Sequence, residues 1–434
     1  MAKKSSNKRA VKKAVKTAAK AEKKHPKAFA TALVLLVIVL IIVACLGVWA
    51  WKTGRLDEWL NLGDGGGTVE ISQGDLADIS TANVSVHFLE LGTANVGDCV
   101  LIKSGNTEVL IDAGAKSARV SKEYLAPTQV MQEYVKTYCT DGILEYVIAT
   151  HAHEDHIAGL VGQGSGTART GFLYQYKVGT IIQFSGHNTT SAIYNNYVSA
   201  VEYCREQGTA VHDAIDCAKG QNGAAKTYYL NDEKTVYMTI LYQRYYEEKA
   251  GKENDYSVCM LLTNEVSATQ KYHYLFTGDL EEKGERSLVE NNPDLPHCVL
   301  FKGGHHGSST SSNTVLLDKI TPENIAICSC AGTYEYADKP TAEEPENYKG
   351  TFPTQEAIDR MGKYTKNIYV TTVGILNEDY STKGFESMNG NIVFYFGKKE
   401  GEEVASLKLW CSNNTTILKD TEWFKQNRVW SGVA

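Results

Sequence analysis

The stretch VIATHAHEDHIAGL, residues 147–160, ends an apolar run with three histidines and two carboxylates in six consecutive positions. Two imidazoles spaced i, i+2 can converge on one metal ion, and an adjacent Asp and His can turn toward a second. A single histidine in an apolar context is usually a satisfied core residue, but five potential donors side by side are hard to explain in that way. The stretch therefore predicts a metal site in a loop at the end of a strand.

Three further segments carry similar side chains where apolar, strand-like runs end. They are VLIDAG (Val109–Gly114), LFTGDLE (Leu275–Glu281) and FKGGHHGSSTSSN (Phe301–Asn313). Taken alone, such Asp- and Gly-containing turns have little meaning, because turns commonly use these residues. Strand-like and helix-like segments alternate from residue 84 onward. This alternation predicts an α/β domain with its chemistry at the strand ends.

The four segments together resemble the motifs of the metallo-β-lactamase superfamily, and they occur in the order of that family. THAHEDHIAGL resembles its H-x-H-x-D-H motif, and the other three resemble its early Asp, bridging Asp and late His motifs. In detail they are most like the hydrolase domain of ComEC-type competence proteins, and they are also similar to phosphorylcholine esterases. The resemblance covers about residues 84–375, and it implies the αβ/βα four-layer sandwich of the family.

The resemblance also implies two bound divalent cations, Zn²⁺ or Mn²⁺. Their ligands would be imidazoles and carboxylates of six residues: His151, His153, Asp155, His156, Asp279 and His306. His151 and His153 would hold the first ion, Asp155 and His156 the second, and Asp279 would bridge the two. Either His305 or His306 would complete the second site, and we favour His306.

The family pattern assigns catalytic roles to three residues of this chain. His305 would face the substrate and transfer a proton, Asp155 would act through the metal, and Asp112 would orient the His-rich segment, as carboxylates behind metal-bound imidazoles commonly do. Many family members have another histidine before the bridging Asp, and His187 is a candidate for that ligand. The late Y-G-H-P stretch of ComEC-type proteins is replaced here by GTFPT, so Phe352 can neither ligate nor donate a proton.

The N-terminal part predicts a membrane anchor. Residues 1–27 contain eleven Lys and Arg and one acid, and they precede 24 residues without a charge, residues 28–51. At about 1.5 Å per residue, a helix of this length spans roughly 36 Å, enough to cross a bilayer. The basic flank predicts a cytoplasmic N-terminus and an extracytoplasmic catalytic domain. Cys45 follows a segment that loosely resembles a lipoprotein processing site, but the apolar run continues beyond it.

These features give a domain order of cytoplasmic tail, transmembrane helix, linker and hydrolase domain, at residues 1–27, 28–51, 52–83 and 84–434. The C-terminal part of the last domain is expected to be β-rich. Residues 56–434 carry 31 Lys and Arg against 50 Asp and Glu, a formal net charge of −19. A body this acidic does not attract polyanions by bulk charge. Its cysteines interrupt apolar runs and are expected to be buried thiols.

The leading hypothesis is a membrane-anchored, extracytoplasmic, binuclear metal-dependent hydrolase that cleaves phosphodiester bonds, with nucleic acid as one possible substrate. The alternative enzyme is a hydrolase of phosphorylcholine or of other cell-surface phosphoesters, which the acidic body suits better. A non-catalytic surface scaffold is the alternative from another class, although the intact ligand set argues against it. The sequence names no protein partner, and it predicts contact with the membrane through residues 28–51.

Overall fold

A computed structural model describes most of the chain beyond residue 71. The described ranges are 72–92, 96–114, 126–328, 351–377, 382–398 and 402–434. The expected cytoplasmic tail and membrane span, Cys45 and most of the expected linker lie outside these ranges. Within them, no helix combines the length and the apolar character needed to cross a membrane.

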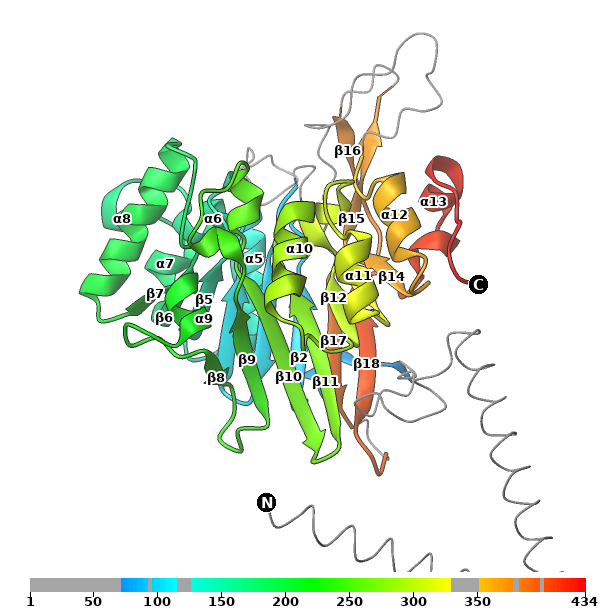
Figure 1. Ribbon diagram of the computed structural model, residues 1–434, viewed down its shortest axis with the longest axis horizontal. Coiled ribbons are helices and arrows are strands. Elements are labelled where there is room, and N and C mark those ends of the chain that lie inside the picture. The colour runs from blue at the N-terminus through cyan, green and yellow to red at the C-terminus, as the bar shows by residue number, and fades with distance from the viewer. Residues whose placement is uncertain (1–71, 93–95, 115–125, 329–350, 378–381, 399–401) are drawn as a thin grey trace, which may run out of the picture. The chain divides into compact units, whose positions relative to one another are not determined.

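Two large β-sheets form the framework (Figure 1). The first has the strand order β1-β18-β17-β2-β3-β4-β5-β6-β7. Its strands are β1 (Ser72–Gln73), β2 (Val84–Phe88), β3 (Val100–Ser104), β4 (Thr107–Ile111), β5 (Ile143–Ala149), β6 (Lys177–Gln183), β7 (Ala210–Asp213), β17 (Ile392–Gly397) and β18 (Ser406–Cys411). The β-rich C-terminal part thus supplies two strands that extend this sheet beyond β2.

The second sheet has the order β14-β13-β12-β11-β10-β9-β8. Its strands are β8 (Thr227–Tyr229), β9 (Val236–Leu241), β10 (Cys259–Ser267), β11 (Gln270–Phe276), β12 (Leu300–Lys302), β13 (Ile325–Ile327) and β14 (Ile368–Val370). A separate hairpin joins β15 (Thr372–Leu376) to β16 (Thr382–Ser387). The chain reaches this hairpin directly from β14.

The two sheets repeat one pairing pattern. In the first, β2, β3 and β4 pair antiparallel, and β4, β5, β6 and β7 then pair parallel. In the second, β9, β10 and β11 pair antiparallel, and β11, β12, β13 and β14 pair parallel. Each half therefore presents the carboxyl ends of its parallel strands at one sheet edge, where ligand sites of α/β proteins form.

Alternation along the strands separates an inner core from an outer one, because successive side chains of a strand point to opposite faces. On β10, Met260 and Leu262 belong to the core between the sheets, whereas Leu261 packs into the outer core beneath the helices. On the first sheet, Phe88 stacks on Phe276 of the facing sheet at 6.3 Å. The sheets thus lie face to face around an apolar interior.

Helices cover the outer faces, which gives the four layers expected from the sequence (Figure 1). The first sheet is covered by α5 (Pro127–Tyr138), α6 (Glu154–Val161), α7 (Phe172–Gln175) and α8 (Ala192–Glu206), and the second by α10 (Glu282–Asn291), α11 (Thr314–Ile320), α12 (Gln355–Met361) and α13 (Glu422–Asn427). Two short helices, α4 (Leu76–Ile79) and α9 (Ala214–Lys219), complete the set of α-helices in the described ranges. The eight described cysteines are all buried and free, as expected.

Two local expectations need correction. Part of the stretch expected to be linker is folded, because β1 pairs parallel with β18 and α4 follows it. The His-rich segment is also not a loop throughout, since α6 begins at Glu154 and places Asp155 in its first turn. Acidic side chains in the first turn favour a helix start at that point, because they offset the positive end of the helix dipole.

Main-chain hydrogen bonds tie the segment before β3, at Asp98, to the early Asp motif and to the His-rich segment. The Asp98 N–H donates to the carbonyl of Asp155 (3.1 Å), and the Gly114 N–H donates to the carbonyl of Asp98 (2.8 Å). The Ala113 N–H donates to the carbonyl of His156 (2.9 Å). Gly114 packs so closely that a Cβ atom there would lie 1.3 Å from the Asp155 carbonyl oxygen. The early Asp motif therefore needs its glycine to fit against the His-rich segment.

Substituting Gly114 should therefore disrupt this junction. We expect Gly114→Ala to lower the free energy of unfolding by about 3 kcal/mol, the upper end of typical overpacking costs. Gly251→Ala is the control, because no atom lies within 4 Å of the Cβ it would add. Urea denaturation followed by tryptophan fluorescence measures both variants, and equal stability of the two would contradict this account of Gly114.

Candidate metal centre

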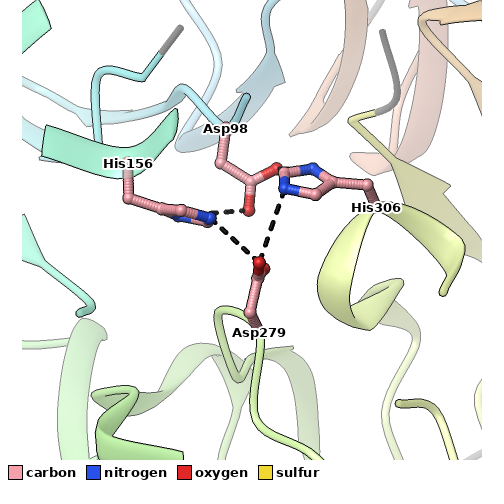
Figure 2. A group of neighbouring side chains, drawn as sticks. All are labelled: Asp98, His156, Asp279 and His306. Carbon is pink, nitrogen blue, oxygen red and sulfur yellow. Dashed lines mark hydrogen bonds and ion pairs between the residues drawn. The ribbon is translucent and has the colours of Figure 1, made fainter. Parts of the chain in front are cut away.

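One carboxylate oxygen lies at the centre of the candidate site. Asp279 follows β11, and four imidazole Nε2 atoms lie within 4.0 Å of its Oδ2 atom. The distances are 3.0 Å from His156, 3.4 Å from His306, 3.8 Å from His305 and 4.0 Å from His151. Figure 2 shows His156, which lies in α6, and His306, which follows β12, approaching Asp279 from two sides. Donors from both halves of the fold thus converge on one point.

The second oxygen of Asp279 shows why a cation fits here. Asp279 is 1% exposed, and its Oδ1 atom has no hydrogen-bond partner among the residues that the structure describes. Burial raises the pKa of this carboxyl, but His156 and His306 outweigh that effect and hold it well below its usual range. A buried carboxylate oxygen without a partner is costly unless a cation or a donor satisfies it. The donor set therefore fits divalent metal ions of the Zn²⁺ or Mn²⁺ type.

His156 is held by the early Asp motif. Its Nδ1–H donates to Asp112 Oδ2 (2.8 Å), which leaves Nε2 directed at Asp279. Asp112 also accepts hydrogen bonds from the Thr150 N–H (2.8 Å) and the Thr150 hydroxyl (2.6 Å). Burial disfavours charge on His156, yet the carboxylates of Asp279 and Asp112 raise its pKa well above the usual value. Asp112 thus lies behind His156 and contacts the ring nitrogen that points away from Asp279.

His151 and His153 form a pair beside this group. His151 Nε2 lies 3.0 Å from His153 Nδ1, the approach expected of two nitrogens that share one ion. His151 is fully buried, and burial lowers its pKa well below the usual value. Its Nδ1 atom lies 3.1 Å from the Thr150 hydroxyl and 3.4 Å from the Ser257 hydroxyl. This imidazole is therefore fixed from behind and neutral.

Asp155 and His306 join the two halves of the fold. His306 Nε2 lies 3.2 Å from Asp155 Oδ2, although 151 positions separate the two residues. The Asp155 side chain keeps about a quarter of its surface exposed, whereas His306 and Asp279 are almost fully buried. Asp155 is therefore the most exposed of these three side chains.

His305 takes a different position from its neighbour. Its Nδ1 atom lies 2.9 Å from the Thr310 hydroxyl and 3.5 Å from the Asn254 side-chain amide nitrogen. Its Nε2 atom is farther from Asp279 than that of His306. Both histidines have a left-handed backbone, with φ of +48° and +52°. Such conformations are strained for residues with a Cβ, and they concentrate at functional sites.

A buried acid holds the loop that carries these histidines. Glu285 of α10 accepts hydrogen bonds from the Ser312 N–H (2.6 Å) and the Asn313 N–H (2.8 Å). Arg360 of α12 donates to the carbonyls of Ser309 (2.7 Å) and Ser312 (3.0 Å). The serine-rich stretch after His306 is thus anchored by two helices.

Two residues at the site were not anticipated from the sequence. Asp98 lies 3.2 Å from His306 Nδ1, and Lys302 Nζ lies 2.5 Å from Asp98 Oδ2, with both residues buried. Asp98, His156, Asp279 and His306 form the one group of the described residues in which two histidines and two aspartates could share an ion. The available signal was a Gly-Asp pair before an apolar strand, and a lysine inside one.

Two further positions singled out from the sequence supply no donor to the centre as the structure describes it. His187 is exposed, its Nδ1 lies 3.0 Å from the Thr189 carbonyl, and its ring packs on Tyr194 at 4.2 Å. Phe352 lies with its ring 6.2 Å from those of both His305 and His306, so it covers the site without supplying a donor.

Comparison with known proteins agrees with this arrangement. Residues 92–162 match the family model described as the metallo-beta-lactamase superfamily, and they include the early Asp motif and the His-rich segment. This match, together with the two-sheet framework, decides the fold. The chain has the metallo-β-lactamase fold.

Individual relatives match over limited parts. The chain is 41% identical over 63 residues to competence protein ComA of Neisseria gonorrhoeae, which covers 14% of this chain and 9% of that protein. The metallo-beta-lactamase fold protein YhfI of Bacillus subtilis is 13% identical, with a TM-score of 0.29 over 56% of this chain and 85% of its own. MEM-A1, a subclass B3 metallo-beta-lactamase from a soil metagenome, is 12% identical, with a TM-score of 0.28 over 55% and 81% of the chains.

The Glu285 contact predicts a measurable pH dependence of stability. Burial raises the pKa of Glu285 from 4.5 to about 7, so the native state binds this proton more tightly than the unfolded chain. The stabilisation is complete below the unfolded pKa and is lost as the pH rises through about 7. We compare the unfolding free energy of the wild type with that of Glu285→Gln. The wild-type value minus the variant value should fall as the pH rises from 4.5 through about 7.

Urea denaturation at a series of pH values gives this difference. Glu282→Gln is the matched control, because Glu282 lies on the same helix with its side chain 62% exposed. Its difference from the wild type should not change with pH. If the difference in unfolding free energy between the wild type and Glu285→Gln also stays constant with pH, burial does not raise the pKa of Glu285 as described.

Proposed function

We propose that the chain is a metal-dependent hydrolase of phosphodiester bonds that holds two divalent cations at the candidate centre. The observation that carries the proposal is the approach of four imidazole Nε2 atoms to within 4.0 Å of Asp279 Oδ2. A scaffold protein has no need of a buried carboxylate surrounded by imidazoles, because such a group adds little stability on its own. The geometry therefore supports a cation-binding site over a scaffold.

The donors divide into two groups around Asp279. His151 and His153, whose facing nitrogens are 3.0 Å apart, are proposed to hold the first cation. Asp155, His156 and His306 are proposed to hold the second, with Asp279 shared between the cations. Cations bound in this way supply Lewis acidity, which promotes ionisation of water and offsets negative charge on a phosphoryl oxygen.

His305 is the proposed proton-transfer group. Its Nδ1 atom is engaged by Thr310, so its Nε2 atom faces the centre. Burial lowers its pKa, which keeps the ring neutral and able to accept or donate a hydrogen bond at neutral pH. Asp155, whose side chain is about a quarter exposed, is proposed to orient a substrate as well as to ligate.

The proposed substrate class rests on the ComEC-type resemblance, with which the partial match to competence protein ComA agrees. A second candidate is a phosphorylcholine or other cell-surface phosphoester. The formal charge of −19 over residues 56–434 favours this second candidate, because it opposes the approach of a long polyanion. Anchoring by residues 28–51, with the hydrolase domain outside the cell, is part of the same proposal.

Loss of the shared carboxylate should abolish metal binding and hydrolysis together. We expect Asp279→Asn, in the full chain purified in detergent, to retain fewer than two Zn²⁺ or Mn²⁺ ions and to hydrolyse bis-p-nitrophenyl phosphate at the uncatalysed rate. Asp232→Asn, an exposed carboxylate in the described part of the chain, is the control and should behave as the wild type. Elemental analysis gives the metal content. A wild-type chain with no metal and no activity would favour the scaffold alternative.

A substrate panel separates the two enzymatic candidates. We expect turnover of bis-p-nitrophenyl phosphate and single-stranded DNA by the Mn²⁺- or Zn²⁺-loaded wild type, with DNA cleavage falling as the ionic strength is lowered, since like charges then repel more strongly. p-Nitrophenylphosphorylcholine and nitrocefin are the competing substrates. Turnover of the choline ester without cleavage of DNA would replace the nuclease proposal with the phosphorylcholine one.

A further inference from the structure

A buried ion pair lies directly behind the candidate centre. Lys302 and Asp98 are 2% and 1% exposed, and Lys302 Nζ lies 2.5 Å from Asp98 Oδ2. Lys302 also donates to the carbonyls of Gly278 and Gly303, each at 3.4 Å, next to Asp279 and the histidine pair. One ammonium group thus connects the strand ends that carry Asp98, Asp279 and His306.

Asp98 faces the rear nitrogens of two imidazoles. Its Oδ1 atom lies 3.2 Å from His306 Nδ1, and its Oδ2 atom lies 3.8 Å from His156 Nδ1. Asp279 instead approaches the Nε2 atoms of the same two rings, at 3.4 and 3.0 Å. Figure 2 shows the two carboxylates on different sides of the imidazoles. A cation held by the two Nε2 atoms therefore lies toward Asp279 and away from Asp98.

The distances also show that Asp98 has to be restrained. A carboxylate oxygen of Asp98 lies within 4.8 Å of ligand atoms of His156, Asp279 and His306, so a modest rotation would bring it to a cation. The Lys302 ammonium, at 2.5 Å, holds that carboxylate on the other side. The His306 Nδ1–H donates to the Cys328 carbonyl (2.9 Å). This bond helps to fix the ring orientation in which the same nitrogen lies 3.2 Å from Asp98 Oδ1.

We propose that Lys302 holds Asp98 behind the centre, where Asp98 positions His306 and His156 for the second cation without ligating it. Asp98 and Lys302 are thus positioning residues. The inference rests on the proposed function, because it assumes that the centre binds two cations.

The test has to separate positioning from stability. Breaking a buried ion pair by removing one partner costs several kcal/mol, whereas replacing both partners by neutral groups is often nearly neutral. The double variant Asp98→Asn with Lys302→Met is therefore the informative one. The matched control is Glu402→Gln with Lys408→Met, since Lys408 is a fully buried lysine of β18 that lies 2.6 Å from Glu402.

Metal titration of the full, metal-stripped chain in detergent gives the affinities for two Co²⁺ ions. We expect the Asp98/Lys302 double variant to bind the second Co²⁺ about 10- to 100-fold more weakly than the wild type, the usual effect of losing a group behind a metal ligand. The first Co²⁺ and the control double variant should keep wild-type affinity. Wild-type affinity for both ions in the Asp98/Lys302 variant would overturn the inference and leave the proposed function intact.

Lys302→Met alone gives an independent readout. Without the ammonium, Asp98 is free to join the second cation, and this raises the coordination number of bound Co²⁺ and weakens its visible absorption. An unchanged Co²⁺ spectrum in this variant would also overturn the inference. A wild-type chain that binds no Co²⁺ would instead overturn the proposed function, so the two failures are distinguishable.

Discussion

The approach of several imidazoles to one carboxylate oxygen is the contact on which the rest of this structure depends. Asp279 Oδ2 has no favourable environment in an apolar core unless positive charge surrounds it. His156 and His306 supply that charge, because their pKa values are raised well above normal despite burial. The site is therefore a cluster of charges that stabilise one another only in this arrangement, and the main-chain contacts around it serve to keep the arrangement fixed.

The repeated topology explains how residues so distant in sequence reach one oxygen. Each half of the chain makes an antiparallel set of strands followed by a parallel set, and the parallel strands end at one edge. The early Asp motif and the His-rich segment follow β4 and β5, and Asp279 and His306 follow β11 and β12. Face-to-face packing of the sheets then brings the two edges together. The centre is thus a product of the packing of the two halves, and neither half contains it alone.

Much of this could be predicted from the sequence, because the metal-type residues lie in short segments directly after apolar strands. His151, His153, Asp155, His156, Asp279, His305 and His306 all lie at the centre, and Asp112 lies behind it. The start of α6 at Glu154 was not predicted. This helix has only eight residues, too few to show a clear helical pattern of apolar positions after the histidines. Asp98 and Lys302 were missed for another reason. A single Asp in a turn and a single Lys in a strand form no distinctive sequence pattern. Their role becomes visible only in the folded chain, where the two side chains from different sheets form an ion pair.

The rear nitrogens of the imidazoles show how the protein prepares this centre for a cation. His156 Nδ1 is engaged by Asp112, His306 Nδ1 by the Cys328 carbonyl, and His305 Nδ1 by Thr310. Each ring is thereby left with Nε2 toward Asp279, which is the tautomer and orientation that metal binding requires. Metal ligands must be deprotonated in order to bind. Because neighbouring carboxylates raise the pKa values of His156 and His306, metal binding at these rings would be coupled to proton release. The left-handed backbone at His305 and His306 belongs to the same site, where strained conformations of this kind tend to concentrate.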